Sequence, residues 1–211
     1  MKKYHIVLCG LVAILLIAVF VACASTSEVK MKMTSQSVDP GTGVTLQGKP
    51  LRLIGEPLKV EKPLPSVELI DAMTMKSVDL SKERGSILLL SVVLSIDTPV
   101  CEEQTHYLSE KGGGLPASVR RIVISRDTPF AQKRFAKEAH LENVQYLSDY
   151  KAGAFGQATG LFIENVMFLA RAVILVDRQG VVRYIQVTPE VASLPDMEAA
   201  FTRATELANS P

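Results

Sequence analysis

The sequence predicts an α/β domain of three layers, α/β/α, with a mixed sheet and a β-hairpin at its start. Apolar runs of strand length alternate along the chain with stretches of helical spacing, as in domains whose sheet is covered by helices. Near the end, the strand-like runs 172–176 and 181–185 flank Asp177-Arg178-Gln179-Gly180, which is typical of an antiparallel hairpin. Parallel and antiparallel neighbours are therefore expected in one sheet.

The first 23 residues have the layout of an export signal. A positive start, Met1-Lys2-Lys3, precedes a stretch without Asp, Glu, Lys or Arg that ends before Glu28. Phe20-Val21-Ala22-Cys23 resembles the lipobox of bacterial lipoproteins, with Phe where Leu is usual, so Cys23 is the expected lipidation site. The expected product is a membrane-anchored lipoprotein that faces the periplasm or the cell exterior.

Two other outcomes stay open for this segment. Ala22-Cys23-Ala24 matches a cleavage site that would release a soluble protein beginning at Ser25, and residues 6–24 are long enough to remain as a membrane anchor. Either cleavage removes Cys9, and Cys23 is then either lipidated or lost. Cys101 is left as the single thiol of the exported domain, so no internal disulfide framework is expected.

Residues 24–42 are polar and short of large apolar groups, which predicts a flexible tether, and residues 43–211 form the expected domain. Its length of about 170 residues suits a single domain with a substantial core. The chain has 23 basic and 22 acidic residues and no basic patch, so no nucleic-acid partner is expected.

Within this domain the elements are expected in a regular order. A hairpin of 44–46 and 51–53 comes first, and the proline-rich stretch 56–65 is a connector. The remaining expected elements are strands at 67–70, 76–80, 87–93, 121–125 and 143–147 and helices at 102–108, 128–139, 151–159 and 195–208.

The run 87–93 is the expected centre of the sheet, because it is rich in branched residues and shows no alternation. The loop that follows lies at the carboxyl end of this strand, where ligands bind in open α/β sheets. Pro99 suits the first turn of a helix, which places Cys101 near unpaired N–H groups and the positive end of the helix dipole.

Such a position favours the nucleophilic thiolate over the thiol, although a lone cysteine is more often an inert core residue. Glu102 and Glu103 oppose the thiolate as nearby anions, so a reactive Cys101 needs a cation close to it.

Five motifs in order give the chain, from about residue 43 to its end, a resemblance to the thiol peroxidase branch of the peroxiredoxins, a thioredoxin-fold family. They are Val44-Thr45-Leu46-Gln47-Gly48, Ser95-Ile96-Asp97-Thr98-Pro99-Val100-Cys101, Gln104-Thr105, Pro129-Phe130-Ala131-Gln132 with Arg134-Phe135, and Ala170-Arg171-Ala172-Val173. The resemblance implies a thioredoxin-like fold and a thiol-dependent reduction of hydrogen peroxide or organic hydroperoxides without a cofactor.

The resemblance also implies a role for each residue of the site. Cys101 would be the peroxidatic cysteine, which attacks a hydroperoxide and becomes a sulfenic acid. Thr98 would hydrogen-bond the thiolate and the peroxide, and Arg171 would supply the cation that the two glutamates make necessary. The residues bordering the substrate pocket would be Pro99, Val100 and Arg134.

Three positions depart from the family pattern. Leu94 replaces a proline, and His106 stands where an arginine is usual. Ala136 corresponds to the resolving cysteine of this branch, so the sulfenic acid has no intrachain partner there. We therefore expect a one-cysteine cycle with an external thiol or thioredoxin-like reductant, or an intermolecular disulfide.

These departures keep a second class of function open, in which the fold is an exported scaffold or redox sensor with a slow or inactive Cys101. A disulfide exchanger is disfavoured because there is no C-x-x-C pair. No metal site is expected, because His5, His106 and His140 form no ligand cluster. Family members commonly form dimers near the active site, so a homodimer is a further expectation.

Overall fold

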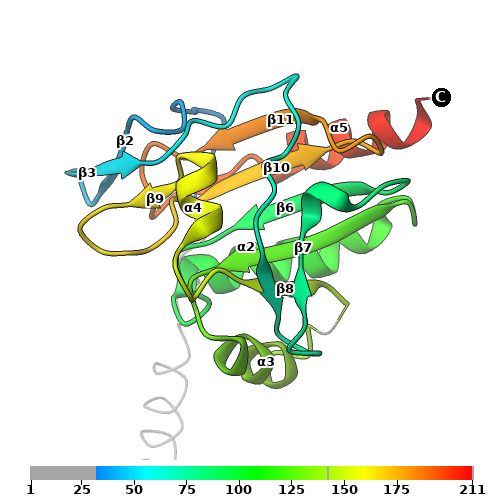
Figure 1. The fold of residues 1–211 in the computed structure, drawn as a ribbon, viewed down its shortest axis with the longest axis horizontal. Helices are drawn as coiled ribbons and strands as arrows, with labels where there is room; N and C mark the ends of the chain where they lie inside the picture. The colour runs from blue at the N-terminus through cyan, green and yellow to red at the C-terminus, as the bar shows by residue number, and fades with distance from the viewer. Residues whose placement is uncertain (1–31, 142, 211) are drawn as a thin grey trace, which may run out of the picture. The chain divides into compact units, whose positions relative to one another are not determined.

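The computed structural model describes residues 32–141 and 143–210 and contains a seven-stranded mixed sheet (Figure 1). The strand order is β11-β10-β6-β7-β8-β4-β5, with β6, β7 and β8 parallel and the remaining pairs antiparallel. These strands span Leu69–Asp71 (β4), Ser77–Val78 (β5), Ile87–Val92 (β6), Val119–Ser125 (β7), Gln145–Ser148 (β8), Ala172–Val176 (β10) and Val182–Val187 (β11). The predicted mixed sheet and its central strand at 87–93 are confirmed.

Alternate residues of the central strand β6 enter two separate apolar clusters, because side chains of a strand point to opposite faces in turn. Ile87, Leu89 and Val93 pack with side chains of three helices, α2 (Pro99–Glu110), α3 (Pro129–Glu138) and α5 (Met197–Asn209). Leu88, Leu90 and Val92 pack on the opposite side, against a layer that contains the short helix α4 (Ala154–Thr159).

The opposite layer also contains a small three-stranded sheet in the order β2-β3-β9, at the left of Figure 1. Its hairpin, β2 (Gly43–Leu46) and β3 (Lys49–Ile54), was predicted from the sequence, whereas β9 (Phe162–Ile163) was not. The connector 56–65 has no helix or strand, as its prolines predicted. Leu58 and Leu64 nevertheless bury their side chains in this layer.

The segment predicted to be a tether differs from that expectation where the structure describes it. β1 (Met33–Thr34) pairs with β12 (Leu194–Pro195), and the N–H of Val38 donates to the carbonyl of Val187 at 3.0 Å. The Gln186 amide donates to the carbonyl of Thr34 at 2.6 Å. Backbone hydrogen bonds of this kind need no apolar side chains, so the polar composition did not reveal them. The signal peptide and Cys23 lie outside the described residues.

Three predicted element boundaries move for local reasons. Helix α4 starts at Ala154 rather than near residue 151, because Gly153 precedes it in the left-handed region with φ 66°. Helix α5 starts at Met197, where the Asp196 side chain accepts the N–H of Ala199 at 3.0 Å. The strand expected at 76–80 is reduced to β5 and a 3₁₀ turn, Leu80–Lys82, and a second 3₁₀ turn, Lys111–Gly114, follows α2.

The register of the sheet brings distant parts of the chain to one edge. Since β6 and β7 are parallel, with Val92 opposite Ile124, the loops that leave both strands emerge together. The antiparallel β10 begins at the same edge, because Ala172 lies opposite Val92. None of the helices within the described residues is both long and apolar enough to cross a membrane.

Candidate active site

Cys101 lies in the first turn of α2, directly after the central strand. Pro99 opens the helix, as the sequence predicted, and Thr98 is its N-cap residue. The first N–H groups of a helix have no intrahelical acceptor and carry a partial positive charge, which favours an anion at this end. Cys101 is a free cysteine with no exposed surface, packed in the apolar cluster beneath the three helices.

The guanidinium of Arg171 contacts this thiol. Arg171 immediately precedes β10, so the antiparallel register that sets Ala172 opposite Val92 carries it to the carboxyl end of the central strand. Its Nη2 lies 3.2 Å from the Sγ of Cys101. The side chain is only 2% exposed, so Arg171 is not a solvated surface residue.

Three contacts hold Arg171 in place, and none is with a carboxylate. Besides the sulfur, its Nη1 donates to the Oε1 of Gln104 at 2.7 Å and its Nε to the carbonyl of Val191 at 2.8 Å. A guanidinium stays charged in proteins, and a buried charge without a counter-ion is unfavourable. Among the described side chains that bond to it, ionised Cys101 is the group that can supply the opposite charge.

Gln104 and Ser91 support this arrangement and had no role in the sequence prediction. The Gln104 amide nitrogen donates to the Ser91 hydroxyl at 2.7 Å, while its oxygen accepts from Arg171, and both residues have no exposed surface. Ser91 is a polar residue inside an otherwise apolar strand, and Gln104 lies on the buried face of α2. Buried polar side chains in such positions need partners, which is the signal that could have identified them.

Thr98 makes a different contact from the one expected. Its hydroxyl donates to the carbonyl of Ser95 at 3.2 Å, and its own carbonyl accepts the N–H of Glu102 at 2.9 Å. With its proton directed to Ser95, the Thr98 oxygen keeps lone pairs with which it can accept a hydrogen bond. Thr98 is thus part of the helix start in the resting protein.

The outer side of α2 carries several acidic side chains. Glu102 is exposed and Glu103 is half-buried. His106 lies at the surface with its Nδ1 2.9 Å from Glu110 and its Nε2 3.9 Å from Glu102. It is therefore a half-buried residue on the outer side of α2. The glutamates are separated from Arg171, whose guanidinium lies on the buried side.

Tyr107 links α2 to α5 at this surface. Burial, and then its hydrogen bond to Glu198, raise the pKa of Tyr107 to about 12. The phenol therefore stays protonated and donates to Glu198 over the whole neutral range. Its ring also stacks on Phe201 with centroids 5.8 Å apart, which fixes α2 against α5.

The residues expected at the pocket rim are exposed to different extents. Pro99 is exposed and Val100 is half-buried at the start of α2. Arg134 is a surface residue of α3, with its guanidinium 3.4 Å from Asp97 and 3.8 Å from Glu138. It reaches the loop before Cys101 but makes no hydrogen bond to the thiol.

Two of the positions that were expected to depart from the family pattern have ordinary packing. Ala136 has no exposed surface and lies in the same apolar cluster as Cys101. Leu94 is half-buried and packs against both clusters of the domain. Within residues 32–141 and 143–210, no group of three His, Cys, Asp or Glu side chains is close enough together to hold a metal ion.

A thiol in the first helical turn after a central strand is the site of a redox protein with a thioredoxin-like fold. Consistent with this class, the family model described as Redoxin matches residues 59–201. The crystal structure of a peroxiredoxin-like protein from Aquifex aeolicus superimposes with a TM-score of 0.75 at 31% identity, covering 81% of this chain and 99% of that one.

Curated relatives specify the family further. The thiol peroxidase of Halalkalibacterium halodurans is 37% identical over 161 residues, which is 76% of this chain and 96% of the relative. The thiol peroxidase from Chromobacterium violaceum has the same fold, with a TM-score of 0.67 at 23% identity and coverage of 78% and 96%. The chain belongs to the thiol peroxidase family, and the resemblance seen in its motifs is confirmed.

Replacing Arg171 by Met tests the contact with the thiol, because Met is unbranched and uncharged. We expect Arg171→Met to lower the second-order rate of Cys101 oxidation by hydrogen peroxide at least about 100-fold, since it removes the buried cation and a donor directed at the reacting sulfur. Stopped-flow measurement of that rate on folded protein, checked by circular dichroism, is the assay.

Arg134→Met is the matched control, because the same substitution there removes only exposed ion pairs. It should change the rate about fivefold or less. Equal losses in the two variants would contradict the special position of Arg171.

Proposed function

We propose that the protein reduces hydroperoxides at Cys101. The observation that carries the proposal is the buried Arg171 guanidinium 3.2 Å from the Cys101 sulfur, with no carboxylate among its bonded partners. A paired cation and a helix start together stabilise a thiolate, the form of cysteine that attacks peroxides. The curated relatives named thiol peroxidase support the same activity.

The chemistry follows from these groups. The Cys101 thiolate attacks the terminal oxygen of the hydroperoxide, an S–O bond forms, and the O–O bond breaks. Cysteine sulfur is oxidised to a sulfenic acid, and the peroxide is reduced to water or an alcohol, which leaves after taking up a proton. Arg171 stabilises the negative charge as it passes from sulfur to the leaving oxygen. Thr98 accepts a hydrogen bond from the hydroperoxide through its free lone pairs.

We further propose a cycle with one cysteine, because Ala136 stands where the resolving cysteine of the family would lie. An external thiol attacks the sulfenic sulfur and displaces water, which gives a mixed disulfide. A second thiol then releases reduced Cys101 and leaves as the disulfide of the reductant. The scaffold or sensor alternative is not favoured, because a silent cysteine has no need of a buried cation beside it.

Oxidation of the full-length protein, purified in detergent, tests this function. We expect Cys101 to react with hydrogen peroxide and cumene hydroperoxide orders of magnitude faster than free cysteine does, and dimedone to trap its sulfenic acid in peptide mass spectrometry. The Cys101→Ser variant should consume no peroxide with a thiol reductant. A rate like that of free cysteine would contradict the proposal.

Introducing a cysteine at Ala136 tests the one-cysteine cycle in the same assay. Because Ala136 occupies the family's resolving position, Ala136→Cys should convert the trapped sulfenic acid into an intrachain disulfide with Cys101. Ala139→Cys, at the C-cap of α3, is the control and should not form this disulfide. An intrachain disulfide between Cys101 and another native cysteine in the unmodified protein would refute the one-cysteine cycle.

We also propose that the protein is exported and anchored by lipid on Cys23, facing the periplasm or the cell exterior. The support is the charge layout of residues 1–27 and the lipobox-like Phe20-Val21-Ala22-Cys23. Labelled fatty acid should be incorporated in a bacterial host, and mass spectrometry should find a mature N-terminus at Cys23. Cys23→Ser should abolish both, whereas a mature N-terminus at Ser25 would favour the soluble alternative.

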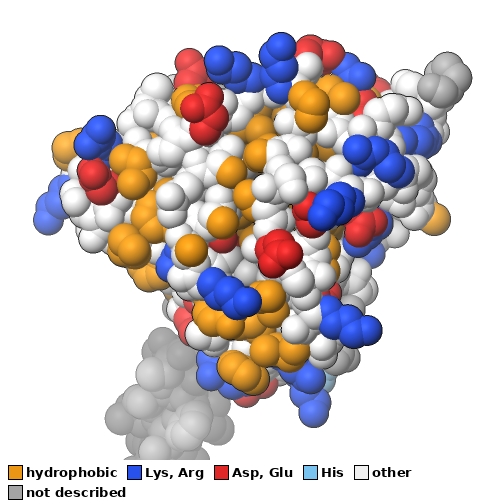
Figure 2. Space-filling model, in the orientation of Figure 1, with side chains coloured by type: hydrophobic (Ala, Val, Ile, Leu, Met, Phe, Trp, Pro, Cys, Tyr) orange, Lys and Arg blue, Asp and Glu red, His pale blue; other side chains and the backbone are white. Residues whose placement is uncertain are grey.

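A homodimer is a further proposal, supported by family resemblance and by apolar side chains at the surface. Val166, Met167 and Phe168 are 39%, 55% and 40% exposed in the segment between β9 and β10, and Phe130 at the start of α3 is 71% exposed. Figure 2 shows hydrophobic side chains reaching the surface in several groups on the face that carries α4 and β9. Sedimentation velocity should show a dimer that Phe130→Asp weakens; a monomer at all concentrations would exclude it.

A further inference from the structure

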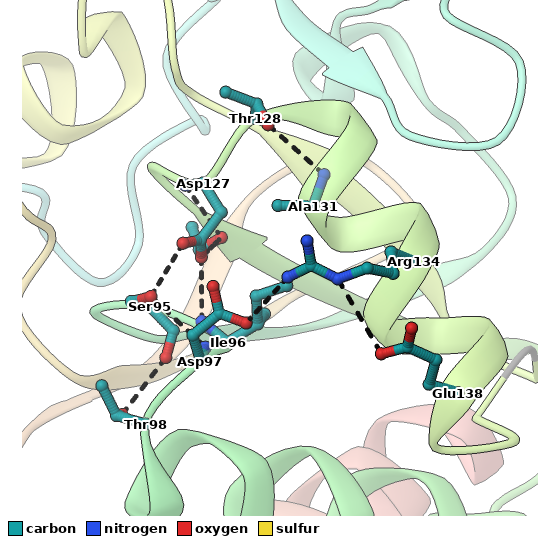
Figure 3. A network of polar contacts seen from close by, with 10 residues as sticks. Ser95, Ile96, Asp97, Thr98, Asp127, Thr128, Ala131, Arg134 and Glu138 are labelled. Atoms are coloured by element: carbon teal, nitrogen blue, oxygen red, sulfur yellow. Dashed lines mark hydrogen bonds and ion pairs between the residues drawn. The ribbon is translucent and has the colours of Figure 1, made fainter.

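Asp127 joins the loop that precedes Cys101 to the end of the neighbouring strand. Its carboxylate accepts the N–H of Ile96 at 2.8 Å and the hydroxyl of Ser95 at 2.8 Å. A third donor, the Ser125 hydroxyl, lies 2.6 Å from the same group. Figure 3 shows Asp127 facing this loop, with the start of α2 just beyond Thr98.

The topology explains why these residues meet. β6 and β7 are parallel neighbours, so the loops that leave their carboxyl ends run side by side although they are some 30 residues apart in sequence. Asp127 lies two residues beyond β7, and Ser95 lies three residues beyond β6. Asp127 itself is fixed from the other side, because its carbonyl accepts the Ser148 hydroxyl at the end of the parallel β8.

The position of this loop determines the position of the reacting sulfur. The Ser95 carbonyl accepts the Thr98 hydroxyl at 3.2 Å, and the Thr98 carbonyl accepts the N–H of Glu102 at 2.9 Å. These two bonds determine where α2 starts. Since Cys101 is the third residue of α2, its sulfur moves with that start relative to Arg171, whose backbone adjoins β10 and whose Nε donates to the Val191 carbonyl.

The loop also makes an ion pair with α3, which is weaker than its contact with Asp127. The Arg134–Asp97 pair has side chains that are 57% and 58% exposed and a separation of 3.4 Å. Solvated ion pairs of this kind contribute little, whereas a carboxylate that accepts backbone and hydroxyl donors makes stronger, charge-assisted bonds. Asp127 is therefore the principal side chain that anchors the loop.

We propose that Asp127 is a positioning residue for the reaction of Cys101 with hydroperoxides, acting through Ser95 and Thr98 to keep the sulfur in register with the Arg171 guanidinium. The inference rests on the proposed peroxidase function. If Asp127 served only the turn that follows β7, the hydrogen bond from Ser125 would be sufficient. Two of its three donors instead come from the loop that leads to the reacting cysteine.

Asp127→Asn tests the proposal in the full-length protein, because the amide keeps the size of the side chain but directs N–H hydrogens at donors. We expect the second-order rate of Cys101 oxidation by hydrogen peroxide to fall about 10- to 100-fold, as small misplacements of reacting groups do. Ser95→Ala, which removes one hydroxyl, should lower the rate in the same direction. The double variant should be no slower than Asp127→Asn alone, since both act through one contact.

Asp149→Asn is the matched control. Asp149 is a more deeply buried carboxylate than the half-buried Asp127. It is 3% exposed and accepts two backbone N–H groups at 3.1 Å, but these belong to Phe155 and Gly156 of α4. We expect it to lower the melting temperature and to leave the oxidation rate of the folded protein within about twofold of the original. A purely structural role of Asp127 would give this same pattern.

The outcomes separate the proposals. A slow parent protein would refute the peroxidase function itself. A fast parent with an unchanged Asp127→Asn rate, equal losses in Asp127→Asn and Asp149→Asn, or additive losses with Ser95→Ala would overturn the positioning role. If Asp127→Asn does not fold, an unchanged rate in Ser95→Ala overturns it, and a reduced rate supports it.

Discussion

A buried guanidinium without a carboxylate is the constraint on which this site depends. Arg171 is almost fully covered, and its bonded partners are a backbone carbonyl, an amide oxygen and the Cys101 sulfur. Burying a cation is unfavourable unless an anion accompanies it. In the proposed function an ionised Cys101 is that anion, which would link the stability of the core to the reactivity of the cysteine. Truncating either Arg171 or Cys101 would change both the stability of the core and the reactivity of the site.

The sheet topology makes this contact without long loops. Parallel β6 and β7 deliver the Cys101 loop and Asp127 to one edge, and antiparallel β10 delivers Arg171 to the same edge from the opposite direction. The Cys101 loop, Asp127 and Arg171 thus all adjoin the ends of strands. Rigid elements of this kind keep the distances between the side chains of a functional site precise. The hydrogen bonds of Gln104 to Arg171 and to Ser91 then join the helix, the arginine and the central strand.

Much of this arrangement could be predicted from the sequence, since it follows from local patterns. The unbroken apolar run predicted the central strand, and Pro99 predicted the start of the helix. Because Glu102 and Glu103 disfavour a thiolate, a nearby cation was expected, and the family motif identified it as Arg171. The part of the tether that docks onto the domain could not be predicted. Its contacts are hydrogen bonds of the backbone, of the Gln186 amide and of the Ser37 hydroxyl. Met33 and Val38 also pack against the core, but two isolated apolar side chains form no periodic pattern.

The role of Asp127 was not predicted from the sequence, for a related reason. An acidic residue between a strand and a helix is typical of an ordinary turn, and only the pairing of β6 with β7 brings it to Ser95 and Ile96. The hydrogen bond from the Thr98 hydroxyl to the Ser95 carbonyl was not predicted either, because a hydroxyl can rotate toward a carbonyl as easily as toward a sulfur. Side-chain partners across loops depend on register, which composition does not specify.

The guanidinium beside Cys101 attracts any anion placed at that sulfur, whatever its oxidation state. Further oxidation of a sulfenic acid gives a sulfinate, which only a dedicated repair enzyme can reverse, and then a sulfonate, which is irreversible. Both products are negatively charged at neutral pH. Arg171 would stabilise these products in the fold at least as well as it stabilises the thiolate. Overoxidised molecules would therefore stay folded, and quality-control proteases that recognise unfolded chains would leave them in place. The contact that activates the cysteine also preserves its damaged form.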